Sequence, residues 1–273
     1  MKIRSLELLV KRYGGDGLYR HFLRAVSGLI FRSGFDADSL FWNYGYAPLA
    51  ADLDLQQRLK ADATHAMLYH ALIGAAWKGA EEPDLIVDVS AGRGGGAMLL
   101  AARFPNSLVV ATDIDEGAMR RLAESDPPDN VVTVVCGGDA LPVGPESTGL
   151  MLAEETLHHF EFEDFLAACR KGLRPGGVLA IAGTSIRSPG EIEERYRAAG
   201  ERHGFSVEVA DVTAHVLKAI ETEPTHISRR VARFRWPLRR LAKEIFIAAG
   251  SERHRELRSG ARHYYFACLS KPS

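Results

Sequence analysis

Cysteine is scarce in this sequence. Among 273 residues there are three cysteines, Cys136, Cys169 and Cys268, and no two of them have a C-x-x-C spacing. This excludes a disulfide framework and a cysteine-based zinc site, and it fits a reducing compartment.

Long apolar runs are missing as well. No run approaches the roughly 18 apolar residues that a membrane helix needs. Near the start, Glu7, Lys11 and Arg12 interrupt the apolar core that a signal peptide requires. We therefore expect a cytoplasmic protein with no membrane partner.

An excess of charge of either sign is also absent, because 34 Lys and Arg residues face 35 Asp and Glu residues. This balance argues against a globally basic nucleic-acid binder. The nearly neutral net charge is nevertheless the sum of a basic part and an acidic part of the chain. Between His226 and Arg262, eleven basic residues face three acidic ones, which leaves an excess of nine negative charges in the rest of the chain. Two interpretations stay open: the arginines belong to a solvated cap and pair with the acidic part of the chain, or one or two of them bind a carboxylate or phosphate of a small molecule, because the guanidinium fork matches such groups.

Short apolar runs alternate with helical patterns through the second half of the chain. Leu85–Val89 is a nearly continuous apolar run before a glycine-rich loop, which is typical of a strand buried on both faces. We predict further strands at 108–113, 131–136, 150–153, 178–182, 207–212 and 263–269. Predicted helices at 95–103, 116–124, 163–171 and 191–203 lie between them. The alternation predicts an α/β fold with a doubly wound, mostly parallel, seven-stranded sheet.

The chain divides into two predicted parts. Residues 1–83 are expected to form a helical lid, with helical patterns at 18–31 and 55–77 and an aromatic segment at 41–48 between them. Residues 84–273 are expected to form one domain. A helical cap at about 214–260 is predicted as an insertion before the last strand of that domain.

Three acidic residues follow successive predicted strands. Asp88 precedes the glycine loop at 92–96, Asp113 ends the second strand, and Asp139 follows the third. Any one of them alone would read as a turn residue or a helix N-cap. Together they converge on the sheet edge where such folds bind ligands, and Asp113 is spaced as an acid that accepts ribose hydroxyls.

The motifs in this region resemble those of class I S-adenosylmethionine-dependent methyltransferases, and in particular bacterial small-molecule enzymes of secondary metabolism. The resemblance rests on five stretches, VDVSAGRGG at 87–95, ATDID at 111–115, GDALP at 138–142, EETLHHF at 154–160 and LRPGG at 173–177. It implies a Rossmann-like methyltransferase fold. Ser90 departs from the pattern, because the family usually has glycine there.

The resemblance implies S-adenosyl-L-methionine as the cofactor. It places the methionine part near Asp88 and the loop, the ribose at Asp113 and the adenine at Asp139 and Ala140. The full set of implied cofactor-binding residues is Tyr44, Tyr46, Asp88, Ser90, Ala91, Gly92, Gly94, Asp113, Ile114, Asp139, Ala140, Ala153 and Glu154. Trp42, Tyr44 and Tyr46 belong to an aromatic segment that folds over the sulfonium in similar enzymes, where aromatic faces suit a cation.

Methyl transfer to a protic acceptor can require a proton acceptor. His158 and His159 follow the fourth predicted strand, and histidine suits this task at neutral pH. We expect His159 to be the base, since the family often has histidine there. Glu154 and Glu155 with these histidines offer metal ligands, but they form a single segment, so we expect no metal.

The predicted activity is therefore transfer of a methyl group to an oxygen, nitrogen or carbon atom of a small molecule. The Pro-Pro-aromatic and Pro-Cys motifs of nucleic-acid base methyltransferases are missing. Two alternatives stay open, namely a cofactor-binding protein that does not methylate and a protein or nucleic-acid methyltransferase that docks through the cap. A homodimer is also left open.

Overall fold

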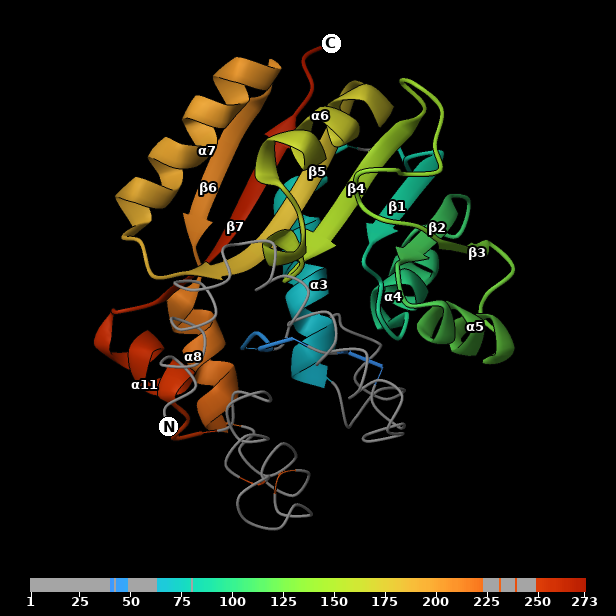
Figure 1. Cartoon of the computed structure of the whole chain (residues 1–273). Coiled ribbons are helices and arrows are strands. Elements are labelled where there is room, and N and C mark those ends of the chain that lie inside the picture. The colour runs from blue at the N-terminus through green and yellow to red at the C-terminus, as the bar shows by residue number, and fades with distance from the viewer. Residues whose placement is uncertain are drawn as a thin grey trace, which may run out of the picture.

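A computed structural model describes residues 40–41, 43–48, 63–79, 81–222, 231, 239 and 249–273. Its centre is a seven-stranded sheet with the order β3-β2-β1-β4-β5-β7-β6 (Figure 1). Neighbouring strands from β3 to β5 are parallel, and β7 is antiparallel to both β5 and β6. The strands are β1 Leu85–Val89, β2 Leu108–Asp113, β3 Val131–Val135, β4 Thr148–Glu154, β5 Leu173–Ser185, β6 Ser206–Asp211 and β7 His263–Ser270.

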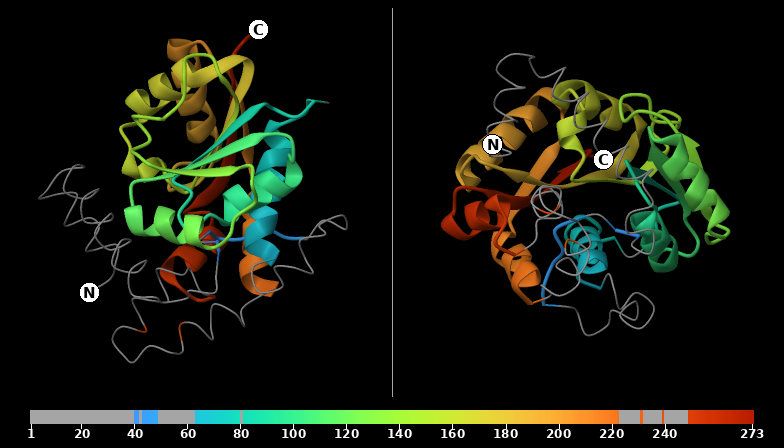
Figure 2. Two further views of the ribbon diagram at one scale, coloured as in Figure 1. Left: turned by 90° about the vertical axis from the view of Figure 1, so that its right-hand side faces the viewer. Right: turned by 60° about the horizontal axis from the view of Figure 1, so that its bottom comes forward.

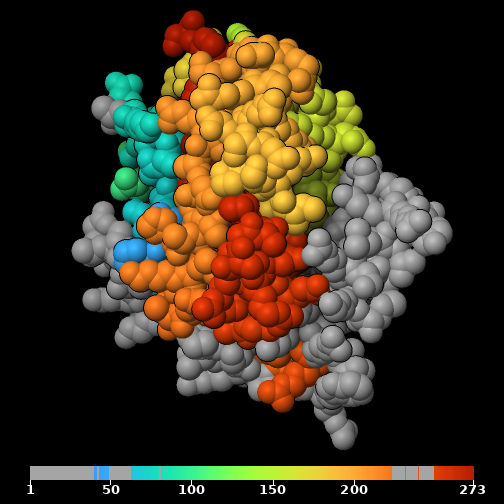
Figure 3. Space-filling model, turned by 90° about the vertical axis from the view of Figure 1, so that its left-hand side faces the viewer, coloured from blue at the N-terminus to red at the C-terminus, as the bar shows by residue number. Residues whose placement is uncertain are grey.

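Helices cover both faces of the sheet, as the two views of Figure 2 show. One face packs against α3 (Ala63–Ala76), α4 (Gly95–Arg103), α5 (Glu116–Glu124) and α8 (Thr213–Thr222). The other face packs against α6 (Phe162–Gly172) and α7 (Pro189–His203). A short 3-10 turn, η1 (Leu157–His159), precedes α6, and α11 (Glu252–Ser259) precedes β7. Figure 3 shows the surface of α11 alongside that of α8.

The strands are apolar on both sides because they are buried on both sides. In β4, Leu150 and Leu152 face the core under α3 and α4, whereas Met151 and Ala153 face the core under α6 and α7. All four side chains are fully buried. This double burial confirms the doubly wound sheet predicted from the sequence.

The predicted elements are confirmed, with changes at some ends. The strand at 108–113 and the helices at 95–103 and 116–124 have the predicted bounds. The predicted strand at 178–182 is too short, because β5 begins at Leu173. Pairing with β4 passes from Leu173 to Val178 with a shift of register, so residues 174–177 stand outside the ladder between β4 and β5.

The parts predicted as a lid and a cap are described only partly. The helical pattern at 18–31, Trp42 and most of the region 223–248 lie outside the described residues. Of the predicted helix at 55–77, the structure gives α3. The division into lid, domain and cap stays a prediction. No helix in the described ranges combines the length and apolar character needed to cross a membrane.

Candidate functional site

The candidate site lies at the carboxyl edge of the sheet, where β1 and β4 end side by side. The strand order reverses between these two strands, since β2 and β3 lie beyond β1 while β5 lies beyond β4. In open α/β sheets, a crevice forms at such a switch point and ligands bind there. Asp88, Ser90, Glu154 and Glu155 all lie at this point.

The glycine loop joins β1 to α4. Gly94, the N-cap of α4, has φ 84°, a conformation that glycine adopts without strain. The amide of Gly92 donates to Asp113 Oδ2 at 2.9 Å, which ties the loop to the end of β2. A Cβ at Gly96 would collide with the Tyr69 ring and lie 2.7 Å from Asp88 Oδ2. The first turn of α4 therefore needs glycine at position 96 for close packing against α3 and β1.

Ser90, the residue that departs from the family pattern, has φ 59°. This left-handed conformation explains why glycine is usual at the position. The Ser90 hydroxyl accepts a hydrogen bond from the Thr156 hydroxyl at 2.7 Å. Serine therefore links the loop after β1 to the turn after β4, a bond that glycine could not make.

Two buried carboxyl groups lie at the centre of the edge. Asp88 is fully buried, and among the described residues neither of its oxygens has a hydrogen-bond partner. Burial, followed by the charge of the nearby Asp113, raises its pKa to about 8.

Glu154 is the second of these groups. Burial, followed by the charge of Glu155, raises its pKa well above the usual value, while hydrogen bonds from the side chains of Tyr69 and Asn43 oppose the shift. Its Oε1 atom has no hydrogen-bond partner within the described part of the chain. Unpaired buried carboxyls are costly, so a positively charged ligand would be strongly favoured here.

The remaining residues predicted to bind the cofactor follow β1, β2 and β3. Asp113 accepts backbone amides on both oxygens, from Gly92 and Asp115, and burial raises its pKa. Ile114, beside it, is 58% exposed, so its side chain offers an apolar surface that a ligand can contact. Asp139 and Ala140 are exposed in the loop after β3, while Ala91 and Ala153 are buried at the ends of β1 and β4.

From the sequence, Glu155 was considered only as a possible metal ligand and was given no other role in the site. It has φ 51° and follows the last residue of β4. Its Oε1 accepts the Tyr264 hydroxyl at 2.8 Å and the Tyr44 amide at 3.1 Å. Burial raises its pKa to about 7, against the opposing effects of Tyr264, Tyr44 and Arg253. These partners are 109 and 111 residues away, so spacing along the chain gave no signal of them.

His158 and His159 lie in η1, with ring centroids 3.9 Å apart. A three-residue 3-10 turn, rather than a regular helix, lets the two rings lie together. Desolvation and the positive charges of His159 and Arg253 lower the pKa of His158 to about 3, so its imidazole is neutral at physiological pH.

The described part of the aromatic segment, residues 40–41 and 43–48, runs along this edge. The Leu40 carbonyl accepts from the Gly95 amide at 3.2 Å, and the Ala47 amide donates to the His215 carbonyl on α8 at 3.2 Å. Tyr44, in between, is 5% exposed. Tyr46 stacks on His215 with ring centroids 4.5 Å apart and also packs on Phe266, so its ring lies toward α8 and β7.

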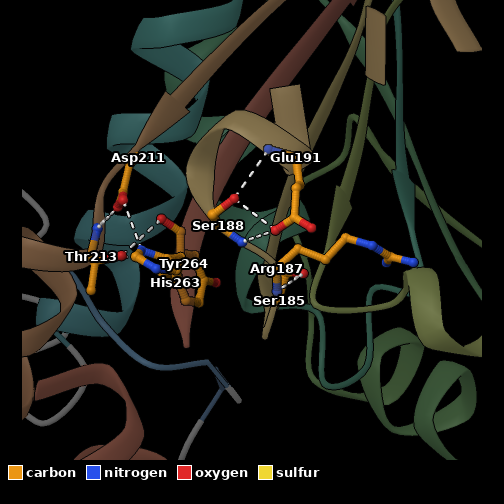
Figure 4. A network of polar contacts seen from close by, with 8 residues as sticks. All are labelled: Ser185, Arg187, Ser188, Glu191, Asp211, Thr213, His263 and Tyr264. Atoms are coloured by element: carbon orange, nitrogen blue, oxygen red, sulfur yellow. Dashed lines mark hydrogen bonds and ion pairs between the residues drawn. The ribbon is translucent and has the colours of Figure 1, made fainter. Parts of the chain in front are cut away.

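A polar network forms the rim at the ends of β5 and β6 and the start of β7 (Figure 4). Asp211 accepts the Thr213 amide at 2.8 Å and contacts His263 Nδ1 at 3.0 Å. Thr213 in turn accepts the Tyr264 amide at 2.8 Å. The neighbouring capping box of α7 joins Ser188 and Glu191. The network fixes the backbone of Tyr264, whose hydroxyl reaches Glu155.

Two arginines of the predicted cap reach the same region. Arg262 donates to Glu256 at 2.8 Å and to Thr184, at the end of β5, at 3.4 Å. The charge of Arg253, on α11, acts on Tyr44, Glu155 and His158. Basic groups from the cap therefore stand beside the acids of the sheet edge.

The residues present fit S-adenosylmethionine. Its sulfonium and ammonium charges match the unpartnered carboxyl oxygens of Asp88 and Glu154, and the loop glycines allow a close backbone approach. For a metal the fit is poor, because within the described ranges no group of three or more His, Cys, Asp or Glu residues could hold an ion.

Comparison with known proteins gives a family match for part of the chain. Residues 87–181 match a family described as "Methyltransferase domain". A curated relative, malonyl-[acyl-carrier protein] O-methyltransferase of Methylococcus capsulatus, is 34% identical over 118 residues, which are 42% of this chain and 43% of the relative. The aligned part thus spans less than half of that relative.

Solved structures share the fold over most of the chain. Geranyl diphosphate C-methyltransferase from Streptomyces coelicolor A3(2), in complex with Mg²⁺, geranyl diphosphate and S-adenosyl-L-homocysteine, has a TM-score of 0.63 at 17% identity. The similarity covers 90% of this chain and 97% of that one. The [4+2]-cyclase SpnF has a TM-score of 0.68 at 14% identity, with 91% and 94% covered. At these identities the similarity concerns the fold, which hosts more than one reaction.

Proposed function

We propose that this chain, whose residues 87–181 belong to the family of methyltransferase domains, is an S-adenosylmethionine-dependent methyltransferase that acts on a small molecule. The observation that carries the proposal is the pair of buried carboxyl groups, Asp88 and Glu154. Each has an unpartnered oxygen among the described residues, beside the glycine loop at the switch point of the sheet. A cationic ligand offsets the cost of burying them.

When bound, the cofactor supplies a methyl group on a positively charged sulfur. Asp88 and Glu154 hold the positive end of the ligand, the loop at 90–96 lets it approach the backbone, and Asp113 accepts the ribose hydroxyls. The segment 40–48 runs along the same edge and limits the entry of water. The chain's main catalytic contribution is then alignment and dehydration of the reacting groups.

His159 is proposed as the residue that takes a proton from a protic acceptor. The lowered pKa of His158 leaves that ring a weak base, which favours its neighbour. The acceptor is proposed to carry a carboxylate or phosphate, because Arg253 and Arg262 bring positive charge to the site. Malonyl and diphosphate groups in the names of two similar proteins agree with this class.

Calorimetry with S-adenosylhomocysteine, followed by methyl transfer from labelled S-adenosylmethionine into a metabolite extract, tests the proposal. We expect binding, and a labelled small product in the fraction retained by an anion exchanger. Absence of binding would refute the proposed function. Binding without any labelled product would favour the non-methylating alternative, for which the fold of SpnF gives a reason. Label in protein or nucleic acid would favour macromolecular methylation.

A further inference from the structure

The residue that joins the aromatic segment to the centre of the sheet is Glu155. Its Oε1 accepts the Tyr44 amide at 3.1 Å and the Tyr264 hydroxyl at 2.8 Å. One oxygen therefore connects three parts of the chain, namely the segment at 40–48, the end of β4 and the start of β7. We infer that Glu155 is a positioning residue that fixes the aromatic segment over the methyl-transfer site.

The geometry around Glu155 is built for a fixed orientation. With φ 51° its backbone holds a conformation that costs a non-glycine residue free energy, and its amide donates to the Ala182 carbonyl on β5 at 2.8 Å. The rim network fixes the backbone of Tyr264 through Thr213 (Figure 4). Two strands therefore fix Glu155: its amide bonds to β5, and its carboxylate bonds to the Tyr264 hydroxyl of β7. The same carboxylate accepts the Tyr44 amide of the segment.

The hydrogen bond from the Tyr44 amide to Glu155 also restrains the position of the Tyr44 ring. This ring meets the Tyr264 ring edge to face, with centroids 5.3 Å apart. The segment is attached at one side to Gly95 and at the other to α8. Between these two ends, Asn43 and Tyr46 bond to α3 at His65 and Thr64, and Glu155 supplies the attachment to the end of β4.

The role needs an oxygen acceptor and not a negative charge. Tyr44 and Tyr264 both donate, and the carbonyl oxygen of a protonated acid or of an amide accepts from both. A pKa of about 7 for this carboxyl agrees with that requirement, because both protonation states then occur near neutral pH. Glutamine at 155 should therefore preserve the arrangement, whereas alanine should abolish it.

Hydrogen exchange of the Tyr44 amide tests the inference without any acceptor substrate. In Glu155→Ala we expect exchange at least about 10-fold faster than in the wild type, and affinity for S-adenosylhomocysteine about 10-fold weaker, since removing the acceptor leaves the Tyr44 amide without its hydrogen bond. Glu155→Gln should stay within about 3-fold of the wild type in both. Exchange from the amides of β1 and β4 checks that each variant is folded.

Glu191→Ala is the matched control. Glu191 also accepts a backbone amide, that of Ser188 at 2.8 Å, but it lies on α7 away from the segment. It should leave Tyr44 exchange and ligand affinity unchanged. Tyr264→Phe, which keeps the carboxylate, should give a smaller acceleration than Glu155→Ala and guards against an alanine variant that fails to fold.

Two results would overturn the inference. The first is unchanged Tyr44 exchange in a folded Glu155→Ala protein. The second is a folded Glu155→Gln protein in which the Tyr44 amide exchanges as fast as in Glu155→Ala, because an oxygen acceptor at position 155 would then not be sufficient to hold the segment. The inference rests on the proposed function for its effect on the cofactor. A wild type that binds no S-adenosylhomocysteine would refute that function, while Tyr44 exchange would still decide the attachment.

Discussion

Two non-glycine residues, Ser90 and Glu155, hold left-handed backbone conformations at the ends of adjacent strands. Each such residue costs on the order of 1–3 kcal/mol, and it persists where the surroundings fix it. Here the Thr156 hydroxyl bonds to Ser90 at 2.7 Å, and Tyr264 and Tyr44 bond to Glu155. The strain lies at the switch point, where it directs two side chains into position beside the glycine loop.

Replacing Asp88 by asparagine should weaken ligand binding but increase the stability of the protein relative to the wild type as the pH rises. Because burial raises the pKa of Asp88 to about 8, the folded state binds more protons than the unfolded state between about pH 4 and 8. The free energy of unfolding contributed by this group therefore falls as pH rises through that window. Asp88→Asn should remove the fall, so the melting temperature of the variant should rise relative to that of the wild type from pH 5 to about 8, and the difference should level off above that pH.

The same variant should bind S-adenosylmethionine about 10- to 100-fold more weakly by calorimetry, since a charge-assisted contact is lost. Asp84→Asn is the control, because Asp84 is exposed just before β1. It should change neither property. A stability difference that does not depend on pH would contradict the assignment of a raised pKa to Asp88.

At the scale of elements, the sequence patterns were sufficient for the strands and helices. Apolar runs such as Leu85–Val89 could be recognised because both faces of the sheet are covered, and the acids at the strand ends marked the binding edge. The start of β5 at Leu173 was missed because the Arg-Pro-Gly-Gly stretch at 174–177 has no apolar strand pattern. Glu155 was missed because its partners come from elements far away in the chain.

The packing of α3 against the first turn of α4 gives a prediction about Gly96. A Cβ there would collide with the Tyr69 ring and approach Asp88 Oδ2 to 2.7 Å. Gly96→Ala should destabilise the protein by about 1–3 kcal/mol, measured by urea unfolding, and should abolish binding of S-adenosylhomocysteine.

Gly190→Ala is the matched change in α7, where a Cβ meets nothing within 4 Å. It should be neutral or stabilising by up to about 1 kcal/mol, because alanine restricts the unfolded chain. Equal destabilisation by both changes would mean that helix propensity, and not the contact with Tyr69, sets the effect.

At the scale of the whole molecule, β7 is the strand on which the sheet depends. It pairs with β5 over eight residues and with β6 over six, and Lys271 follows directly after it. Lys271 is 5% exposed, and its Nζ donates to the Leu173 carbonyl at 2.8 Å and contacts Glu146 at 2.8 Å. A buried ammonium thus ties the end of the last strand to the start of β5.

Lys271→Met should remove this tie while keeping a side chain of similar length. We expect a loss of about 2–4 kcal/mol in the free energy of unfolding, because the Leu173 and Arg170 carbonyls lose a donor. Chemical denaturation measures the change. Lys171→Met, at the exposed end of α6, should stay within about 0.5 kcal/mol of the wild type. Similar values for the two variants would contradict a structural role for Lys271.

The place of β7 between β5 and β6 also bears on how the chain is made. A ribosome releases residues 263–270 after all the other strands, yet β6 has no partner in the described sheet except β7. During synthesis β6 and the outer edge of β5 therefore remain unpaired, and unpaired edges are prone to aggregation. Nascent chains halted before residue 263 should be captured by chaperones that bind exposed strands, and their release should coincide with emergence of β7.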